Sequence, residues 1–378
     1  MMSTKIVFNK PYFSGNELAY IEASIRSGKI SGDGIFTKKC INYFNERYRL
    51  NGLLTTSCTD ALEMASILAN IQPGDEVIAP SYTFVSTVNA FMLRGAKIQF
   101  IDSGEDDPNI DAWQIESKIT KKTKLIVPVH YAGVACNMDL ILEIAKKYNL
   151  MVIEDAAQAI DSYYKKKPLG SFGDLATFSF HESKNIISGE GGMLVINNSK
   201  YYERAEIIRE KGTNRAQFFR GEINKYGWKD IGSSFLPSDI IAAYLFSQLE
   251  CLNDIQSKRK LIWQRYYDEL YELEIDGFIK RPIITDYATN NAHMFYIICN
   301  NLESRSRLIE FLKFNKIMAV FHYSPLHKSE YYLRFNPYQK LKNAEKYDEC
   351  LLRLPLFYEL TGKQQDYIIS KIQEFFRK

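Results

Sequence analysis

Short runs rich in β-branched and aromatic residues recur through the first two hundred residues, and helical patterns separate several of them. The runs cover residues 53–56, 76–79, 97–101, 124–129, 150–153, 177–180 and 193–196. Amphipathic helical segments occupy residues 59–70, 84–93 and 138–148. Strands that alternate with helices form βαβ units around a largely parallel sheet. Ligands of such sheets bind beyond the carboxyl ends of the strands, so we look for functional residues in the loops that follow them.

The pattern changes after about residue 235. A long helical stretch, 238 to about 273, is followed by a strand at 292–299, a helix at 304–314, a strand at 318–322 and two closing helices. This order predicts a smaller α+β domain. We therefore expect a large α/β domain over residues 1–250, a small C-terminal domain over 251–378, and packing of the first thirty or so residues against the small domain.

Composition excludes several classes of protein. The 378 residues carry a net charge of +3 and are 46% hydrophobic, which argues against a chain that coats nucleic acid or anionic membrane. The N-terminus lacks the apolar core of a signal peptide, and no run of eighteen apolar residues could span a membrane. The six cysteines have no CxxC pair and no metal-ligand spacing. A cytoplasmic protein with reduced thiols and no metal is expected.

An acidic pair ends the predicted strand in MVIEDAAQAI. Glu154 and Asp155 follow Ile153 directly, and Gln158 comes three residues later. A carboxylate at the tip of a buried strand is unfavourable unless it meets a cation or a hydrogen-bond donor. A protonated ring nitrogen would satisfy Asp155. The alternative is that Asp155 only caps the next helix.

A lysine lies just beyond another predicted strand, in ATFSFHESKNIISGEGG. Lys184 follows polar Ser179 and precedes a glycine-rich turn. Loss of solvation in such a loop lowers the pKa of an amine and makes it a usable nucleophile for a Schiff base. Taken alone, however, a loop lysine is usually a surface charge.

Two further segments suggest an anion site and an aromatic contact. In LLTTSCTDAL, a strand leads directly into a helix at Ser57, Cys58 and Thr59, whose free N–H groups suit a phosphate. Simple helix capping is the alternative. In PSYTFVST, Tyr82 follows a strand and could stack on a planar ring or pack in the core.

Together, an acid for a ring nitrogen, a lysine for an aldehyde, a phosphate site and an aromatic ring are what pyridoxal phosphate requires. The succession SCTDAL, PSYTFVST, EDAAQA, SFHESKN and GEGG resembles the DegT/DnrJ/EryC1/StrS family of sugar aminotransferases. The resemblance extends from SGKISGDG to YSPLH and LRLPLF. It implies the aspartate aminotransferase superfold (fold type I), pyridoxal 5′-phosphate as cofactor, and a homodimer with shared active sites.

The resemblance also assigns roles to individual residues. Lys184 corresponds to the Schiff-base lysine, Asp155 to the partner of the pyridine nitrogen, and Gln158 to a residue near the ring hydroxyl. Cys58, Thr59 and Ser179 match the phosphate site, Tyr82 matches the stacking aromatic, and Asn185 is a supporting residue. Some members carry His in place of the lysine and act as dehydratases, which the presence of Lys184 argues against.

The chain departs from the broad family before its long helix. Many members have G-x-N-Y-R there, whose Asn reaches the phosphate of the neighbouring subunit's cofactor, whereas this chain has IGSSFLPSD. Ser234 is the candidate replacement. The variant resembles a subgroup that uses L-glutamate to aminate C4 of dTDP-4-keto-6-deoxy-D-glucose. The product is the dTDP-4-amino-4,6-dideoxygalactose of surface polysaccharides.

The sequence leaves other functions open. Amination at C3 of a 3-keto sugar, formation of the gluco epimer, and a catalytically silent relative are the alternatives. An NAD-dependent enzyme would need G-x-G-x-x-G, which is absent after the first strand. For sugar binding, His327 and Tyr323 in YSPLH and Arg215 in a basic, aromatic segment are candidates. His130 and His322 are expected to face the cleft, and each histidine could instead be structural.

Overall fold

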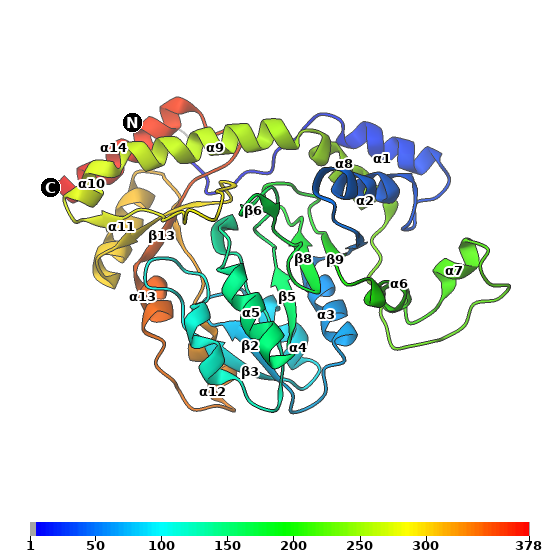
Figure 1. The fold of residues 1–378 in the computed structure, drawn as a ribbon. Coiled ribbons are helices and arrows are strands. Elements are labelled where there is room, and N and C mark those ends of the chain that lie inside the picture. The colour runs from blue at the N-terminus through cyan, green and yellow to red at the C-terminus, as the bar shows by residue number, and fades with distance from the viewer. Residues whose placement is uncertain (1–4, 378) are drawn as a thin grey trace.

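A seven-stranded sheet forms the centre of the computed structural model, which describes residues 5–377 (Figure 1). The strand order is β1-β9-β8-β5-β4-β2-β3, and only β9 runs antiparallel to its neighbours. The mostly parallel α/β sheet expected from the sequence is therefore confirmed. Its strands are β1 (Gly52–Thr55), β2 (Glu76–Pro80), β3 (Lys97–Ile101), β4 (Thr123–Ile126), β5 (Met151–Asp155), β8 (Leu175–Ser179) and β9 (Gly192–Ile196).

Helices cover both faces of this sheet because successive strand residues point to opposite sides. Leu54 and Val152 belong to one buried cluster, and their neighbours Leu53 and Ile153 belong to another. The first cluster packs under α2 (Ile35–Tyr48), α5 (Met138–Tyr148) and α8 (Asp239–Glu250). The second packs under α3 (Cys58–Leu68), α4 (Ser86–Met92) and α6 (Tyr202–Arg209).

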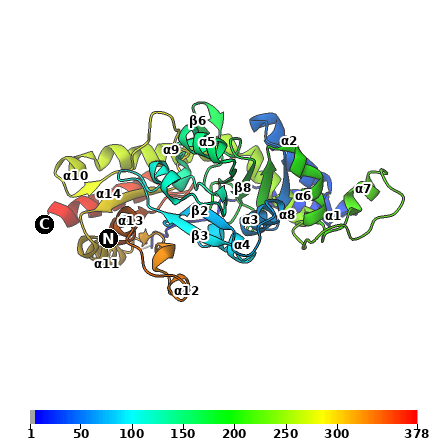
Figure 2. The same ribbon diagram turned by 60° about the horizontal axis from the view of Figure 1, so that its bottom comes forward.

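A second, antiparallel sheet has the order β10-β11-β13-β12. Its strands are β10 (Ile279–Lys280), β11 (Phe295–Cys299), β12 (Val320–Phe321) and β13 (Leu351–Leu354). Figure 2 shows its helices at the opposite end of the molecule from α7 (Arg215–Phe219). These helices are α9 (Leu252–Glu269), α10 (Tyr271–Ile275), α11 (Leu302–Phe314), α12 (Glu330–Leu333), α13 (Lys342–Cys350) and α14 (Gly362–Arg377). A third apolar cluster fills this part, so it has a core of its own.

The long helical stretch predicted for 238–273 is three helices rather than one. Cys251 separates α8 from α9, and Leu270 separates α9 from α10. Both residues leave the helical region, with ψ values of 4° and 5°. Neither is a glycine or proline, so the apolar periodicity continues across both breaks and conceals them. The expected division after residue 250 coincides with the end of α8.

One of the two inner strands of the second sheet, β13, was not expected. β13 pairs with both β11 and β12, yet its four residues follow α13 without an intervening turn residue. Arg353 also interrupts its apolar pattern. The two closing helices are therefore α13 and α14, with a strand between them.

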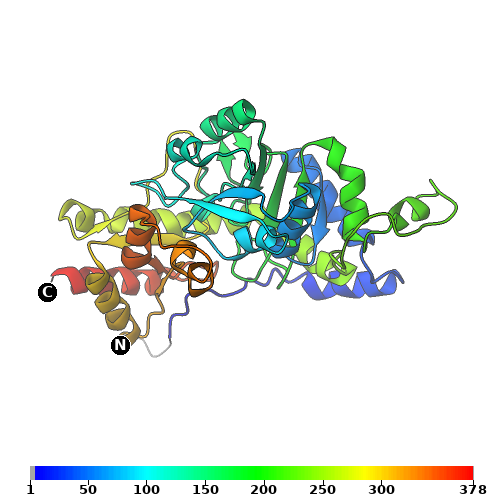
Figure 3. The same cartoon turned by 90° about the horizontal axis from the view of Figure 1, so that it is seen from below.

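The N-terminal segment contacts both parts of the molecule. Ile6 accepts a backbone hydrogen bond from Met318 and donates one to Lys316, which ties it to the segment that leads into β12. Figure 3 shows the chain then running across the molecule to α1 (Glu17–Arg26). There Ser24 Oγ donates to the buried Asp239 of α8 at 3.1 Å. The first thirty residues thus divide their packing between the two sheets.

Two further findings concern membrane-spanning helices and the cysteines. Within residues 5–377 no helix combines the length and apolarity needed to cross a membrane. All six cysteines are free, and four of them are buried.

Candidate active site

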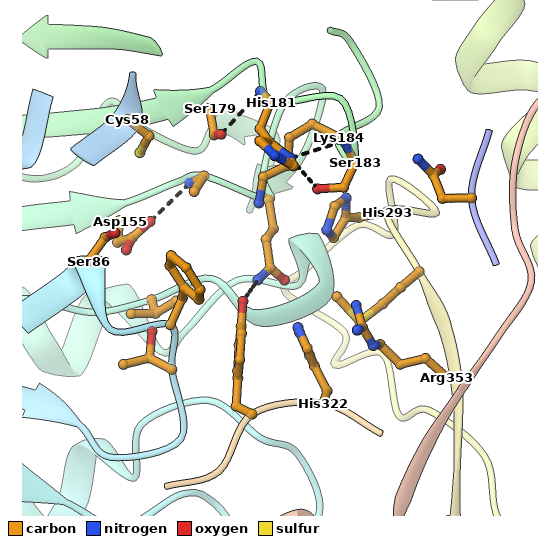
Figure 4. Close-up of a pocket in the computed structure, with 18 of the residues that line it drawn as sticks. Cys58, Ser86, Asp155, Ser179, His181, Ser183, Lys184, His293, His322 and Arg353 are labelled. Carbon is orange, nitrogen blue, oxygen red and sulfur yellow. Dashed lines mark hydrogen bonds between the residues drawn. The ribbon is translucent and has the colours of Figure 1, made fainter. Parts of the chain in front are cut away.

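A cavity of about 800 Å³ lies between the two sheets, beyond the carboxyl ends of β5 and β8. Figure 4 shows Cys58, Ser86, Asp155 and Ser179 on one side of the cavity, with His293, His322 and Arg353 on the other and Lys184 between them. The large sheet and the small sheet each provide one wall. The cavity is at the place that a parallel α/β sheet makes available to ligands.

The first turn of α3 forms a polar end of this cavity. Ser57 caps the helix, and its Oγ accepts from the N–H of Asp60 at 3.0 Å. Thr59 Oγ1 donates to Ser86 Oγ at 2.8 Å, while Ser179 ends β8 alongside. Helix N-termini attract anions because their first N–H groups have no partner within the helix. This end of the cavity therefore suits a phosphate group.

Close approach of β9 to α3 requires a glycine. A Cβ atom on Gly192 would lie 2.4 Å from the carbonyl carbon of Ser57 and 2.5 Å from the nitrogen of Cys58. The glycine lets the strand pack directly against the start of the helix. Burial raises the pKa of Cys58 to about 12, so its thiol stays neutral beside an anion.

Asp155 ends β5 with its carboxylate in the cavity. Oδ2 accepts from Thr87 Oγ1 at 2.7 Å, and Oδ1 accepts from the N–H of Ala157 at 3.1 Å. No ion pair joins Asp155 to a cationic side chain within the part of the chain that the structure describes. Asp155 is a buried carboxylate, oriented by two donors, that faces open space. That environment would favour a protonated ring nitrogen opposite it.

The neighbouring Glu154 points to the other side of the strand and has a structural role. Its carboxylate accepts from the N–H groups of Gly170, Phe172 and Gly173 at 2.6–2.9 Å and contacts His130 Nε2 at 3.1 Å. Burial acts to raise the pKa of Glu154, but the interactions with His130 and with the N–H groups of Gly173 and Gly170 lower it overall. The expectation that His130 faces the cleft is wrong, because it is fully buried against Glu154.

Lys184 extends into the cavity from the loop after β8. The backbone N–H of Lys184 donates to the carbonyl oxygen of His181 at 2.9 Å, and this bond closes a tight turn. Burial lowers the pKa of the Lys184 amine, and the charge of Arg353 lowers it further, although Cys58 and Asp155 oppose the shift. A lowered pKa increases the fraction of neutral amine, which is the nucleophilic form.

Gln158 is held from both ends of its amide at the cavity wall. Its Oε1 accepts from the N–H of Ala132 at 2.7 Å, and its Nε2 donates to the hydroxyl of Tyr323 at 3.0 Å. Gln158 and Tyr323, two of the residues expected from sequence, both line the cavity. The structure thus brings together Lys184, Asp155, Cys58, Thr59, Ser179, Gln158 and Tyr323.

Tyr82 does not line the cavity. It is buried, donates its hydroxyl proton to the carbonyl of His322 at 2.9 Å, and packs against Tyr131, Tyr323 and Tyr347. The expectation of a stacking contact does not fit this placement. Phe84, two residues later, lines the cavity and is 56% exposed.

Three other expected residues also lie outside the cavity in this single chain. His327 is fully buried between Ser81 Oγ at 2.7 Å and Glu345 at 3.2 Å, which is a structural environment. Ser234 is exposed and forms a bridge with Glu210. Arg215 lies on α7, which extends away from the body of the molecule in Figure 1.

Sequence reasoning missed most of the second wall. Arg259 of α9, His293 before β11 and Arg353 of β13 all line the cavity. His322, which was expected in the cleft, lies there too. A signal was present in the sequence, since a charged residue within the apolar run LRLPLF is unusual for a core strand.

The fold and this site define a pyridoxal-phosphate-dependent enzyme of fold type I. The DegT/DnrJ/EryC1/StrS aminotransferase family matches residues 12–373, and the chain belongs to that family. It is 34% identical to GDP-perosamine synthase of Escherichia coli O157:H7, over 97% of each chain. It is 31% identical to the spore coat polysaccharide biosynthesis protein SpsC of Bacillus subtilis, over 97% of this chain and 96% of that protein.

A solved structure shows the same likeness in three dimensions. The putative sugar aminotransferase Spr1654 of Streptococcus pneumoniae, in its PLP form, superposes with a TM-score of 0.90 at 25% identity, over 99% of this chain and 99% of that one. The residues described above fit pyridoxal phosphate. The start of α3 with Ser86 and Ser179 would hold the phosphate, Asp155 the ring nitrogen and Lys184 the aldehyde carbon.

Proposed function

We propose that this protein transfers an amino group from L-glutamate to C4 of dTDP-4-keto-6-deoxy-D-glucose. The products would be dTDP-4-amino-4,6-dideoxy-D-galactose and 2-oxoglutarate, made in the cytoplasm for surface polysaccharide synthesis. The observation that supports aminotransferase activity is that Lys184 and Asp155 lie in one cavity beside the start of α3. The names of the relatives, a perosamine synthase and a polysaccharide biosynthesis protein, support a sugar substrate. The choice of C4 rests on the motifs FHESKN and IGSSFLPSD.

Each residue of the site has a part in this reaction. When bound, pyridoxal phosphate supplies a ring that accepts electrons from the carbon that loses its proton. Thr87 and the N–H of Ala157 hold the carboxylate of Asp155 in place, and its negative charge would favour a protonated ring nitrogen. The amine of Lys184 would hold the aldehyde carbon of the cofactor and, once free, would be placed to move a proton as a general base and acid.

Arg353 provides a place for the carboxylate of the amino acid. Its Nε is buried without an acceptor, and its only hydrogen bond within residues 5–377 runs from Nη2 to the carbonyl of Phe321 at 3.3 Å. No carboxylate of the described chain pairs with it. Of the other cations in the cavity, Lys184 reacts and Arg259 binds two backbone carbonyls. A planar guanidinium with free N–H groups binds a carboxylate in bidentate fashion.

Replacing Arg353 by glutamine is expected to slow the reaction with L-glutamate about 100-fold, because one charge-assisted bidentate contact contributes roughly 3 kcal/mol. The half-reaction with the keto sugar should change by less than about threefold, within ordinary context effects. Stopped-flow absorbance of the cofactor measures each half-reaction separately. Arg305→Gln is a matched control. Arg305 lies near the ring of Phe321, the residue whose carbonyl binds Arg353, but it does not line the cavity. Equal loss in both half-reactions would contradict the assignment.

A homodimer would complete the site. Arg215 and Ser234 are exposed here, and α7 carries Phe219 at 65% exposure in a projecting segment with Trp228 at 82%. Large exposed aromatic side chains of this kind are typical of contact surfaces. We therefore expect a dimer in which this segment reaches a second copy. Light scattering tests this, and an active monomer would contradict it.

The function itself is tested by product analysis. The purified protein is incubated with pyridoxal phosphate, L-glutamate and dTDP-4-keto-6-deoxy-D-glucose, and the sugar product is examined by NMR. An axial amine at C4 supports the proposal. An equatorial amine indicates the gluco epimer, and an amine formed only from a 3-keto sugar indicates a C3 enzyme. Cofactor binding without any amine transfer would indicate a silent relative.

A further inference from the structure

A buried cluster of amides lies directly behind the loop that carries Lys184. Asn185 contacts Gln256 of α9, the carbonyl of Asn291, and the Nδ1 atom of His293. The His293 ring also lines the cavity, as Figure 4 shows beside the Lys184 loop. One nitrogen of this imidazole therefore faces the protein, and the other is available to the cavity.

The orientation of the Asn185 amide follows from its partners. Its nitrogen lies 2.8 Å from the carbonyl oxygen of Asn291, which has no proton to donate, so the NH₂ group must point there. The same NH₂ group donates to Gln256 Oε1 at 2.8 Å. The oxygen of Asn185 is therefore the atom 2.9 Å from His293 Nδ1. Since that oxygen can only accept, Nδ1 of His293 must carry a proton.

His293 is also neutral. Burial holds its pKa well below the usual value, and the charges of Lys184, Arg259 and Arg353 around it act in the same direction. A neutral imidazole with its proton on Nδ1 has a lone pair on Nε2. His322 differs, because its Nδ1 contacts the hydroxyl of Tyr131, which can donate or accept. Only His293 of these two has a tautomer that its partners fix.

The backbone around His293 is held at an energetic cost. Ala292 has φ of 52°, which is strained for a residue with a side chain. Arg259 donates from Nε to the carbonyl of Ala292 at 3.1 Å and from Nη2 to that of His293 at 2.7 Å. A Cβ on Gly133 would lie 2.0 Å from Oδ1 of Asn291, so a glycine is required for this packing. The ring is thus rigidly placed, as a binding group needs to be.

We propose that Nε2 of His293 accepts a hydrogen bond from the substrate hydroxyl on the carbon next to the reacting carbonyl. This inference rests on the proposed function. L-Glutamate has no hydroxyl group at neutral pH, whereas a 4-keto-6-deoxy sugar carries one beside its carbonyl carbon. The bond from Asn185 fixes the acceptor relative to Lys184, the preceding residue. An acceptor at this place binds the sugar and leaves the amino acid half-reaction unaffected.

The test measures the two half-reactions of the pyridoxal-phosphate-loaded protein separately. His293→Phe should weaken binding of the keto sugar 10- to 100-fold and change the L-glutamate half-reaction less than threefold, in line with the loss of one buried hydrogen bond. His293→Gln, which places an amide oxygen near the position of Nε2, should restore part of the affinity. A keto sugar that lacks the adjacent hydroxyl should bind the unsubstituted protein as weakly as the normal sugar binds His293→Phe.

Several results would overturn the proposal. Equal losses in both half-reactions would make His293 a structural residue, and unchanged sugar binding would remove the contact. If the unsubstituted protein shows no reaction with L-glutamate at all, the proposed function fails first, so the two failures are distinct.

A second measurement does not depend on activity or on the stability of His293→Phe. The chain has five histidines, so a ¹⁵N-histidine spectrum of the loaded protein is simple, and His293→Gln identifies the signal. We expect Nε2 without a proton and no change between about pH 6 and 8. A protonated Nε2 in that range would contradict the tautomer and the proposal together.

Discussion

Lys184→Ala is expected to lower turnover by at least about 10⁴-fold, because positioned proton transfer alone contributes about 10²–10⁴ and the covalent attachment is lost as well. The Lys184 amine is the only amine among the described residues that line the cavity. The polar start of α3, Ser86 and Asp155 do not depend on it. The protein should therefore still bind pyridoxal phosphate, now without the visible absorption band of the lysine-bound cofactor.

Absorption spectra and equilibrium dialysis measure these two effects. Added small primary amines should restore a small part of the activity by replacing the missing side chain. Lys146→Ala is a suitable control, since Lys146 is exposed on α5, distant in sequence from the loop. Normal turnover of Lys184→Ala would refute the role of the lysine, and loss of cofactor binding would contradict the expectation that the remaining contacts hold the cofactor without it.

Asp155→Asn is expected to slow both half-reactions by about 10²–10³-fold, the usual cost of removing one positioned electrostatic group. An amide does not stabilise a protonated ring nitrogen as a carboxylate does, so the ring becomes a weaker acceptor of electrons. The fold should tolerate the change. Thr83 and Thr87 form a hydroxyl chain at 2.8 Å in which either can donate, so the chain can reverse to suit an amide.

The kinetics of Thr87→Val provide the comparison for Asp155→Asn. That variant removes one donor to the carboxylate but keeps its charge, so the loss should stay below about tenfold, the value of one hydrogen bond. Thermal unfolding of both variants checks that the fold is intact. Rates of Asp155→Asn close to those of the unsubstituted protein would remove Asp155 from the reaction.

The first wall of the site could be predicted because its residues follow strands in the sequence. Asp155 is the last residue of β5, and Lys184 lies in the loop that begins at the end of β8, so their position at the edge of a parallel sheet follows from the strand pattern. The second wall could not be placed in this way. His293 and Arg353 reach the cavity only through packing of the antiparallel sheet, and no local pattern encodes that packing.

The errors have equally specific causes. Tyr82 and Phe84 are close in the sequence, and only the tertiary structure decides which aromatic ring is buried and which reaches the cavity. His130 follows a strand like Asp155, but its partner Glu154 lies on the far face of the sheet. Ser234 was expected from a contact between subunits of the family, and Arg215 from its basic, aromatic segment. Both residues lie on the surface of the single chain.

The bonds from Asn185 to Gln256 and Asn291 also constrain protein engineering. A chimera that takes its first 250 residues from this chain and the remainder from a relative would divide this cluster at its centre. The part taken from the relative would have to supply equivalents of Gln256, Asn291 and His293. Without them, the loop that carries Lys184 would lose the contacts that hold Asn185. Substrate range is therefore more easily altered by exchanging single residues of the cavity than by exchanging domains.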